Sequence, residues 1–206
     1  MSVATEKTAS SSSTVLTSVA GLNAEGIHRL VLEKDNHGAV HCFQLALTLL
    51  NRHLRDPDTL LDDPPTATQD ASASTTIPIA DLNDDGFYIY NHTLCISEEH
   101  CDLGEAIMIL LFNLALATHH QGMQLGNTLK LEKAVRTYQL CARSVALHPT
   151  GNRSGVILTL SLLCHNNGAQ IHYRHLGNPT RGLEILASIQ AENLTDATGQ
   201  FGRGCF

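Results

Sequence analysis

The sequence has no tryptophan, few basic residues and no long uninterrupted run of apolar residues. Its 13 Lys and Arg against 20 Asp and Glu give a formal net charge of −7, which leaves no extended basic surface for nucleic acid or an anionic membrane. The longest apolar run, 106–116 with Asn113 inside it, is shorter than the roughly 20 residues of a membrane-spanning helix. We therefore expect no nucleic acid and no membrane among the partners.

Closely spaced cysteine pairs are also missing. The six cysteines contain no Cys-x-x-Cys, and a chain of 206 residues is long enough to bury a core without disulfides. We expect reduced cysteines packed in that core. The N-terminus shows no basic stretch that leads into an apolar run, as a secretory leader would. The sequence therefore predicts an intracellular protein, either cytoplasmic or nuclear.

Sequence motifs for catalysis do not occur. There is no Gly-x-Ser-x-Gly, no phosphate-binding glycine loop and no His-Glu-x-x-His, so we expect no enzyme activity, no cofactor and no bound metal. An enzyme in a helical fold stays an alternative, because catalytic residues can come together from distant positions. A calcium-regulated binding module is a second alternative. Its loop would be 81–86, Asp-Leu-Asn-Asp-Asp-Gly, although His92 stands where a calcium loop needs a bidentate glutamate.

Helical periodicity dominates the rest of the chain. Apolar residues three and four positions apart predict helices at 24–33, 39–50, 103–121, 131–145, 156–175 and 183–190. Because these helices come in closely spaced pairs, they predict three helical hairpins. Asp102 followed by Glu105 resembles a capping box, and Gly122 and Gly177 stand where a left-handed residue would end the first helix of a pair.

Composition divides the chain further. The Ser- and Thr-rich N-terminus has too few large apolar residues to offset the entropy of ordering, and prolines interrupt the stretch after the first hairpin. Alternation of apolar and polar residues after the acidic loop predicts a short extended segment. The predicted organisation is a disordered tail (1–21), a first hairpin (22–51), a flexible linker (52–80), an acidic turn with the extended segment (81–100), further hairpins (101–200) and a C-terminal tail (201–206).

Two of the predicted second helices share a pattern of small and aromatic residues. It reads Ala-x3-Phe-x2-Ala at 39–46 and Ala-x3-Tyr-x2-Cys at 134–141, and Gly182 with Leu186 is a weaker third copy. Small residues allow two helices to cross closely while the ring fills the gap between them. The pattern resembles the tetratricopeptide (TPR) family, whose helix-turn-helix repeat is about 34 residues long. The copies here are farther apart, so the resemblance is to a divergent TPR-like array.

The resemblance implies an all-α fold of antiparallel hairpins stacked as a right-handed superhelix, whose first helices form a concave face that binds a protein or peptide. Polar side chains there would hydrogen-bond the backbone or a carboxylate of the ligand. By position, the groove-facing candidates are Phe112, Asn113, His119, His120, Asn167 and Arg174. The last hairpin has no polar capping helix after it, which predicts that it self-associates, docks a partner there, or is part of a longer protein. The alternative is an irregular helical bundle, which would close on itself without a groove.

Overall fold

The computed structural model describes residues 3–56, 90–97, 101–147 and 155–187. Its helices are α1 (Val3–His28), α2 (Asn36–Arg55), α3 (Leu103–Leu125), α4 (Thr128–Leu147) and α5 (Gly155–Gln170). Wide π turns follow α1 at Arg29–Glu33 and α5 at Ile171–His175, and residues 179–187 are helical again. No strand occurs in these four stretches. The prediction of an all-α chain is confirmed.

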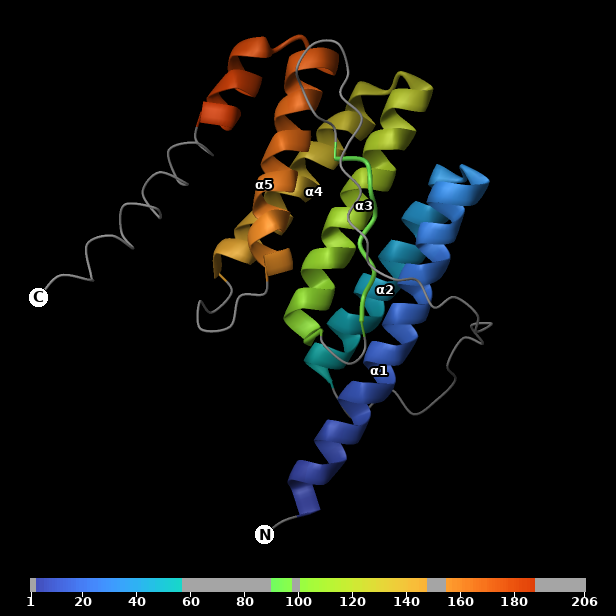
Figure 1. Cartoon of the computed structure of the whole chain (residues 1–206). Helices are drawn as coiled ribbons and strands as arrows, with labels where there is room; N and C mark the ends of the chain where they lie inside the picture. The colour runs from blue at the N-terminus through green and yellow to red at the C-terminus, as the bar shows by residue number, and fades with distance from the viewer. Residues whose placement is uncertain (1–2, 57–89, 98–100, 148–154, 188–206) are drawn as a thin grey trace, which may run out of the picture.

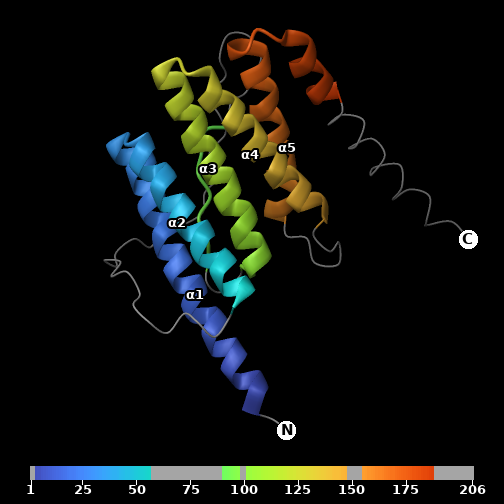
Figure 2. The same ribbon diagram turned by 180° about the vertical axis from the view of Figure 1, so that it is seen from behind.

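Successive helices run antiparallel and form hairpins, as predicted. Each helix packs mainly against the next one along the chain, and α3 also touches α1 and α5. Figure 1 shows α1, α3 and α5 side by side in one layer, and Figure 2, seen from the opposite side, shows α2 and α4 as the second layer, in front of them in that view. The first helices of the hairpins therefore share one face of the molecule.

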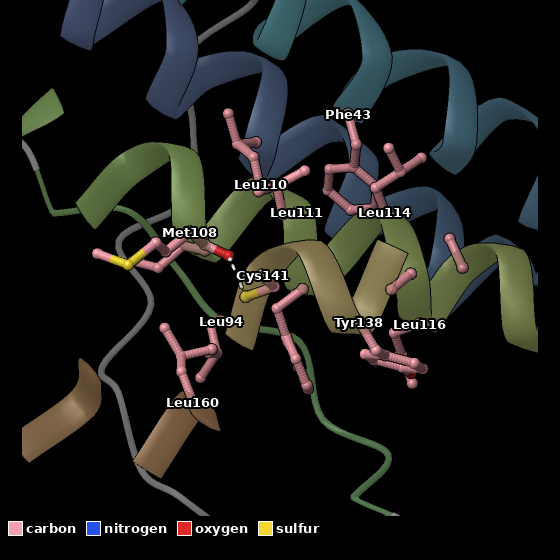
Figure 3. Packing of buried hydrophobic residues seen from close by; sticks show 14 of the residues in the cluster. Phe43, Leu94, Met108, Leu110, Leu111, Leu114, Leu116, Tyr138, Cys141 and Leu160 are labelled. Atoms are coloured by element: carbon pink, nitrogen blue, oxygen red, sulfur yellow. Dashed lines mark hydrogen bonds between the residues drawn. The ribbon is translucent and has the colours of Figure 1, made fainter. Parts of the chain in front are cut away.

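α3 is the central helix of the core. Nearly all of its side chains from Ala106 onward are buried, and in Figure 3 it lies between the first hairpin and α4. Phe43 of α2 and Tyr138 of α4 pack in the same apolar cluster, in which the Cys141 thiol donates a hydrogen bond to the carbonyl of Met108. By length and composition α3 could cross a membrane, but 72% of its most apolar window is buried inside the protein, so packing accounts for its apolar character.

The helices cross closely at the small residues, as the sequence pattern predicted. In the 39–46 motif, both alanines and Phe43 are fully buried. A Cβ added to Gly26 would lie only 2.5 Å from Cε1 of Phe43, so α1 approaches the Phe43 ring as closely as a glycine allows. In the third hairpin, a Cβ added to Gly182 would lie 2.8 Å from the carbonyl oxygen of Ala169.

The N-terminus differs from the predicted disordered tail over 1–21. α1 begins at Val3, and Val15, Leu16 and Val19 are buried. These residues recur at helical spacing and complete an apolar stripe, which α2 and α3 cover. For residues 14–21 the prediction was wrong, because it weighed the Ser- and Thr-rich composition above the spacing of the few apolar residues.

Two further boundaries are corrected by the structure. The predicted linker begins later than residue 52 because α2 continues to Arg55, and the remainder of 52–80 lies outside the described residues. Gly122 does not end α3, which continues to a left-handed Gly126 with φ +57°. Gly122 packs against Leu131 instead.

Two predictions about turns hold, and the prediction that the cysteines pack in the core holds for three of the five described ones. The Asp102 carboxylate caps α3 by accepting a hydrogen bond from the Glu105 amide at 2.8 Å, and Gly177 adopts the predicted left-handed conformation. All five described cysteines are free, and Cys42, Cys141 and Cys164 are buried, whereas Cys95 is exposed and Cys101 half-buried.

The close crossing at Gly26 predicts opposite outcomes for two glycine substitutions. Gly26→Ala should lower the free energy of unfolding by about 1–3 kcal/mol, because its Cβ would overlap the Phe43 ring. Gly168→Ala is the matched control: it also lies in a helix, but its Cβ would meet nothing within 4 Å. That substitution should raise the free energy of unfolding by about 0.5–1 kcal/mol. Chemical denaturation measures both, and equal effects at the two sites would contradict the close crossing.

Candidate functional site

An extended segment lies along the shared face of α1, α3 and α5. It comprises residues 90–97, called the resident segment below, and Figure 1 shows it as the green trace in front of α3. Leu94 and Ile96 are buried, whereas Asn91 and Cys95 are exposed. Alternate burial is typical of an extended chain that lies on a surface. Residues 90–97 lie within the stretch for which the sequence predicts an extended segment.

Asn113 and Asn23 hold the middle of the resident segment. The Asn113 carbonyl oxygen accepts a hydrogen bond from the Leu94 amide at 2.9 Å, and the Asn113 amide nitrogen donates to the Leu94 carbonyl at 2.7 Å. Asn23 donates to the same carbonyl at 3.0 Å and accepts from Asn113 at 2.8 Å. Both asparagines are buried. We call this arrangement the Leu94 clamp.

Asn167 holds the beginning of the resident segment in the same way. Its carbonyl oxygen accepts from the Tyr90 amide at 3.0 Å, and its amide nitrogen donates to the Tyr90 carbonyl at 3.0 Å. The same nitrogen donates to the Tyr138 hydroxyl at 3.2 Å, which fixes the side chain in place. We call this arrangement the Tyr90 clamp. The two clamps lie on α3 and α5, and Asn23 on α1 joins the first of them.

The clamps recognise backbone in one conformation. An extended residue directs its own N–H and C=O to the same side, and a carboxamide offers one acceptor and two donors that match them. The paired bonds do not depend on the side chain of the residue that is held. The face formed by α1, α3 and α5 can therefore bind an extended polypeptide through its backbone.

A row of aromatic rings connects the clamps with the interior. The Tyr90 ring lies 5.8 Å from the Phe112 ring, which lies 5.9 Å from the Tyr138 ring. The His119 ring follows at 6.3 Å from Tyr138. Burial raises the pKa of the Tyr138 hydroxyl far above its usual range. It therefore stays neutral and can accept the hydrogen bond from Asn167.

His119 is fully buried, and neither of its ring nitrogens has a hydrogen-bond partner in the described part of the chain. Burial, with smaller contributions from the nearby His120 and His175, lowers its pKa to about 3. His120 is half-buried, and its pKa is lowered chiefly by burial. Arg174 lies half-buried in the π turn after α5. His119 and His120 follow Asn113 on α3, and Arg174 and His175 follow Asn167 in the turn after α5. All four residues therefore lie on the C-terminal side of the clamp residues.

The structure brings the predicted groove residues together in part. Asn113 and Asn167 both bind the resident segment, but Phe112, Asn113 and His119 are fully buried and face no solvent. Asn23 is the groove residue that the sequence analysis missed, because it lies next to the predicted tail. The signal was available, since it is an asparagine among apolar residues on the first helix of its pair, as Asn113 is.

A cleft of about 500 Å³ lies between α4, α5 and residues 179–187. Its lining includes Arg143, His165 and Arg181, and Arg181 pairs with Glu184 at 3.0 Å. Within the four described stretches, no group of three His, Cys, Asp or Glu side chains could hold a metal ion. The acidic loop 81–86 lies outside them.

The buried His119 ring predicts a loss of stability in acid. An unfolded histidine titrates near its ordinary pKa of about 6.5, whereas folding lowers the pKa of His119 to about 3. Between these values the unfolded state binds a proton that the folded state does not. The free energy of unfolding therefore falls below about pH 6.5, by about 2 kcal/mol from this ring at pH 5.

His119→Phe keeps the ring and removes the titration, so it should flatten this pH dependence and should also stabilise the fold near neutral pH, since no unpartnered polar atom remains. Part of the slope will persist, because burial also lowers the pKa of His120, His172 and His175. His41→Gln, at an exposed position, is the control. Denaturant titrations at pH 7 and pH 5 measure the effect, and an unchanged slope in His119→Phe would contradict it.

Known proteins give no further assignment of this site. No protein-family model matches the chain, and no curated protein and no solved structure matches it either.

Proposed function

We propose that this chain is a non-catalytic protein-interaction scaffold, a divergent TPR-like array whose concave face binds an extended segment of a protein or peptide. The face is formed by α1, α3 and α5 together with the resident segment. The observation that carries the proposal is the pair of clamps, in which Asn113 and Asn167 each bind both the N–H and the C=O of one extended residue.

Burial of these asparagines supports a binding role. Asn113 and Asn167 are fully buried, and an unpaired buried amide costs about 1–3 kcal/mol. The face is therefore unfavourable when empty, and it is satisfied by any chain that supplies an extended backbone. A surface with this property binds an extended polypeptide in preference to a helix, because the backbone groups of a helix are already paired with one another.

The proposal predicts that a peptide added in trans replaces the resident segment. In a triple variant, Tyr90→Gly with Leu94→Gly and Ile96→Gly, the inward-facing side chains are removed and the clamps stay. A fluorescein-labelled peptide with the sequence of residues 88–97 should bind this variant saturably and raise its Tm, because a ligand of the folded state stabilises it. Fluorescence anisotropy and thermal unfolding are the measurements.

Backbone methylation of the peptide supplies the matched control. N-methyl groups at the positions of Tyr90 and Leu94 remove the two N–H groups that donate hydrogen bonds to the clamps, and they should weaken binding at least about tenfold. N-methyl groups at the positions of Asn91 and Cys95 should leave binding unchanged, because these amides form no hydrogen bond in the described structure. Equal binding of both methylated peptides would contradict the proposal.

The triple variant has a second readout if it does not fold alone. The peptide should then restore its helical circular dichroism, whereas the peptide methylated at the clamped positions should not. Absence of binding to a folded triple variant, or of rescue of an unfolded one, would reject the scaffold function at this face.

A further inference from the structure

We infer that the Tyr90 half of the resident segment is a self-inhibitory contact, and that the partner is an extended polypeptide segment whose aromatic side chain replaces Tyr90 on Phe112 while its backbone replaces that of Tyr90 on Asn167. This inference rests on the proposed function and adds to it the class of ligand and the means of regulation.

The Leu94 half of the resident segment is firmly anchored. Three amide hydrogen bonds of 2.7–3.0 Å converge on Leu94, and both Leu94 and Ile96 are buried. Only residues 98–102 separate this half from the start of α3. Such a short connection keeps the effective concentration of the Leu94 half at its clamp high, so a free peptide competes poorly there.

The Tyr90 half is held less firmly. Asn167 alone binds its backbone, with two hydrogen bonds of 3.0 Å, and the Tyr90 side chain is only half-buried. The amides and carbonyls of Asn91, His92 and Thr93 form no hydrogen bond in the described structure. The backbone between the two clamps can therefore bend without breaking a bond. On its other side, more than thirty residues of sequence separate Tyr90 from the end of α2.

Exchange at the Tyr90 clamp would conserve both backbone hydrogen bonds to Asn167 and the ring contact with Phe112. Asn167 and Tyr138 are buried, so an empty clamp would leave the amide without its two backbone partners. An incoming extended residue supplies the same N–H and C=O, and its aromatic ring supplies the contact that Tyr90 makes with Phe112 at 5.8 Å. The ligand therefore needs an extended backbone and one aromatic side chain at the clamped position.

The test compares two forms of the full chain with one short probe. The probe is a labelled hexapeptide with the sequence of residues 87–92, which carries the aromatic half alone. If Tyr90 competes with the probe, Tyr90→Gly should bind it at least about tenfold more tightly than the natural chain, because the fraction of open clamp limits the apparent affinity. Asn91→Gly adds the same backbone freedom next to the clamp and should bind as the natural chain does.

The inference also requires that the probe displaces Tyr90 from its clamp in the natural chain. Saturating probe should shift the Tyr90 amide resonance in a ¹H–¹⁵N spectrum and leave the Leu94 amide in place, and Asn167→Ala should abolish binding in both forms. Equal affinity of the natural chain and Tyr90→Gly would overturn the inference, as would a Tyr90 resonance that saturating probe does not move. Either result leaves the proposed function standing if the longer peptide binds the triple variant. If neither the hexapeptide nor the longer peptide binds, both the inference and the proposed function are rejected.

Discussion

The structure depends on one interaction, the pairing of an asparagine carboxamide with both backbone groups of an extended residue. It occurs at Leu94 and again at Tyr90. Each pairing allows a polar side chain to lie inside an apolar helix layer, since it satisfies the asparagine and the captured peptide groups together. Without the resident segment, Asn113 and Asn167 would lose the backbone groups that they bind and would keep, within the described residues, only their bonds to Asn23, Asn166 and Tyr138. The resident segment is therefore a part of the protein interior as well as a ligand of the face on which it lies.

The helix packing explains why such a face exists at all. Small residues at the crossings, such as Ala39 and Gly26, bring the helices of a hairpin close together, and the apolar α3 stands at the centre. The first helices then lie next to one another and share one face. A closed bundle would turn that face inward against other helices. In this protein the resident segment covers that face. Its backbone requires polar side chains at matching positions along α1, α3 and α5.

Periodicity predicted most of the fold, since the spacing of apolar residues gives helix faces directly. The pattern at 39–46 correctly predicted a close crossing. Asn113 was predicted to bind the backbone of a ligand, and it binds the backbone of Leu94 in the chain itself. Composition misled at residues 14–21, where a few buried apolar residues outweigh many serines. That residues 90–97 lie on the face of α1, α3 and α5 was beyond the sequence, because pairing across long separations depends on tertiary geometry that local spacing does not encode. Asn23 was missed for another reason, because it lies next to the stretch that composition had assigned to a disordered tail.

Amide hydrogen exchange along residues 90–97 tests the central claim most directly, because it reports each backbone N–H separately. The account predicts slow exchange at Tyr90 and Leu94, whose amides donate to Asn167 and Asn113, and fast exchange at Asn91, Thr93 and Cys95 between and beyond them. Uniformly fast exchange would mean that the asparagines do not hold the chain. Protection at the odd-numbered positions in place of Tyr90 and Leu94 would contradict the register of both clamps.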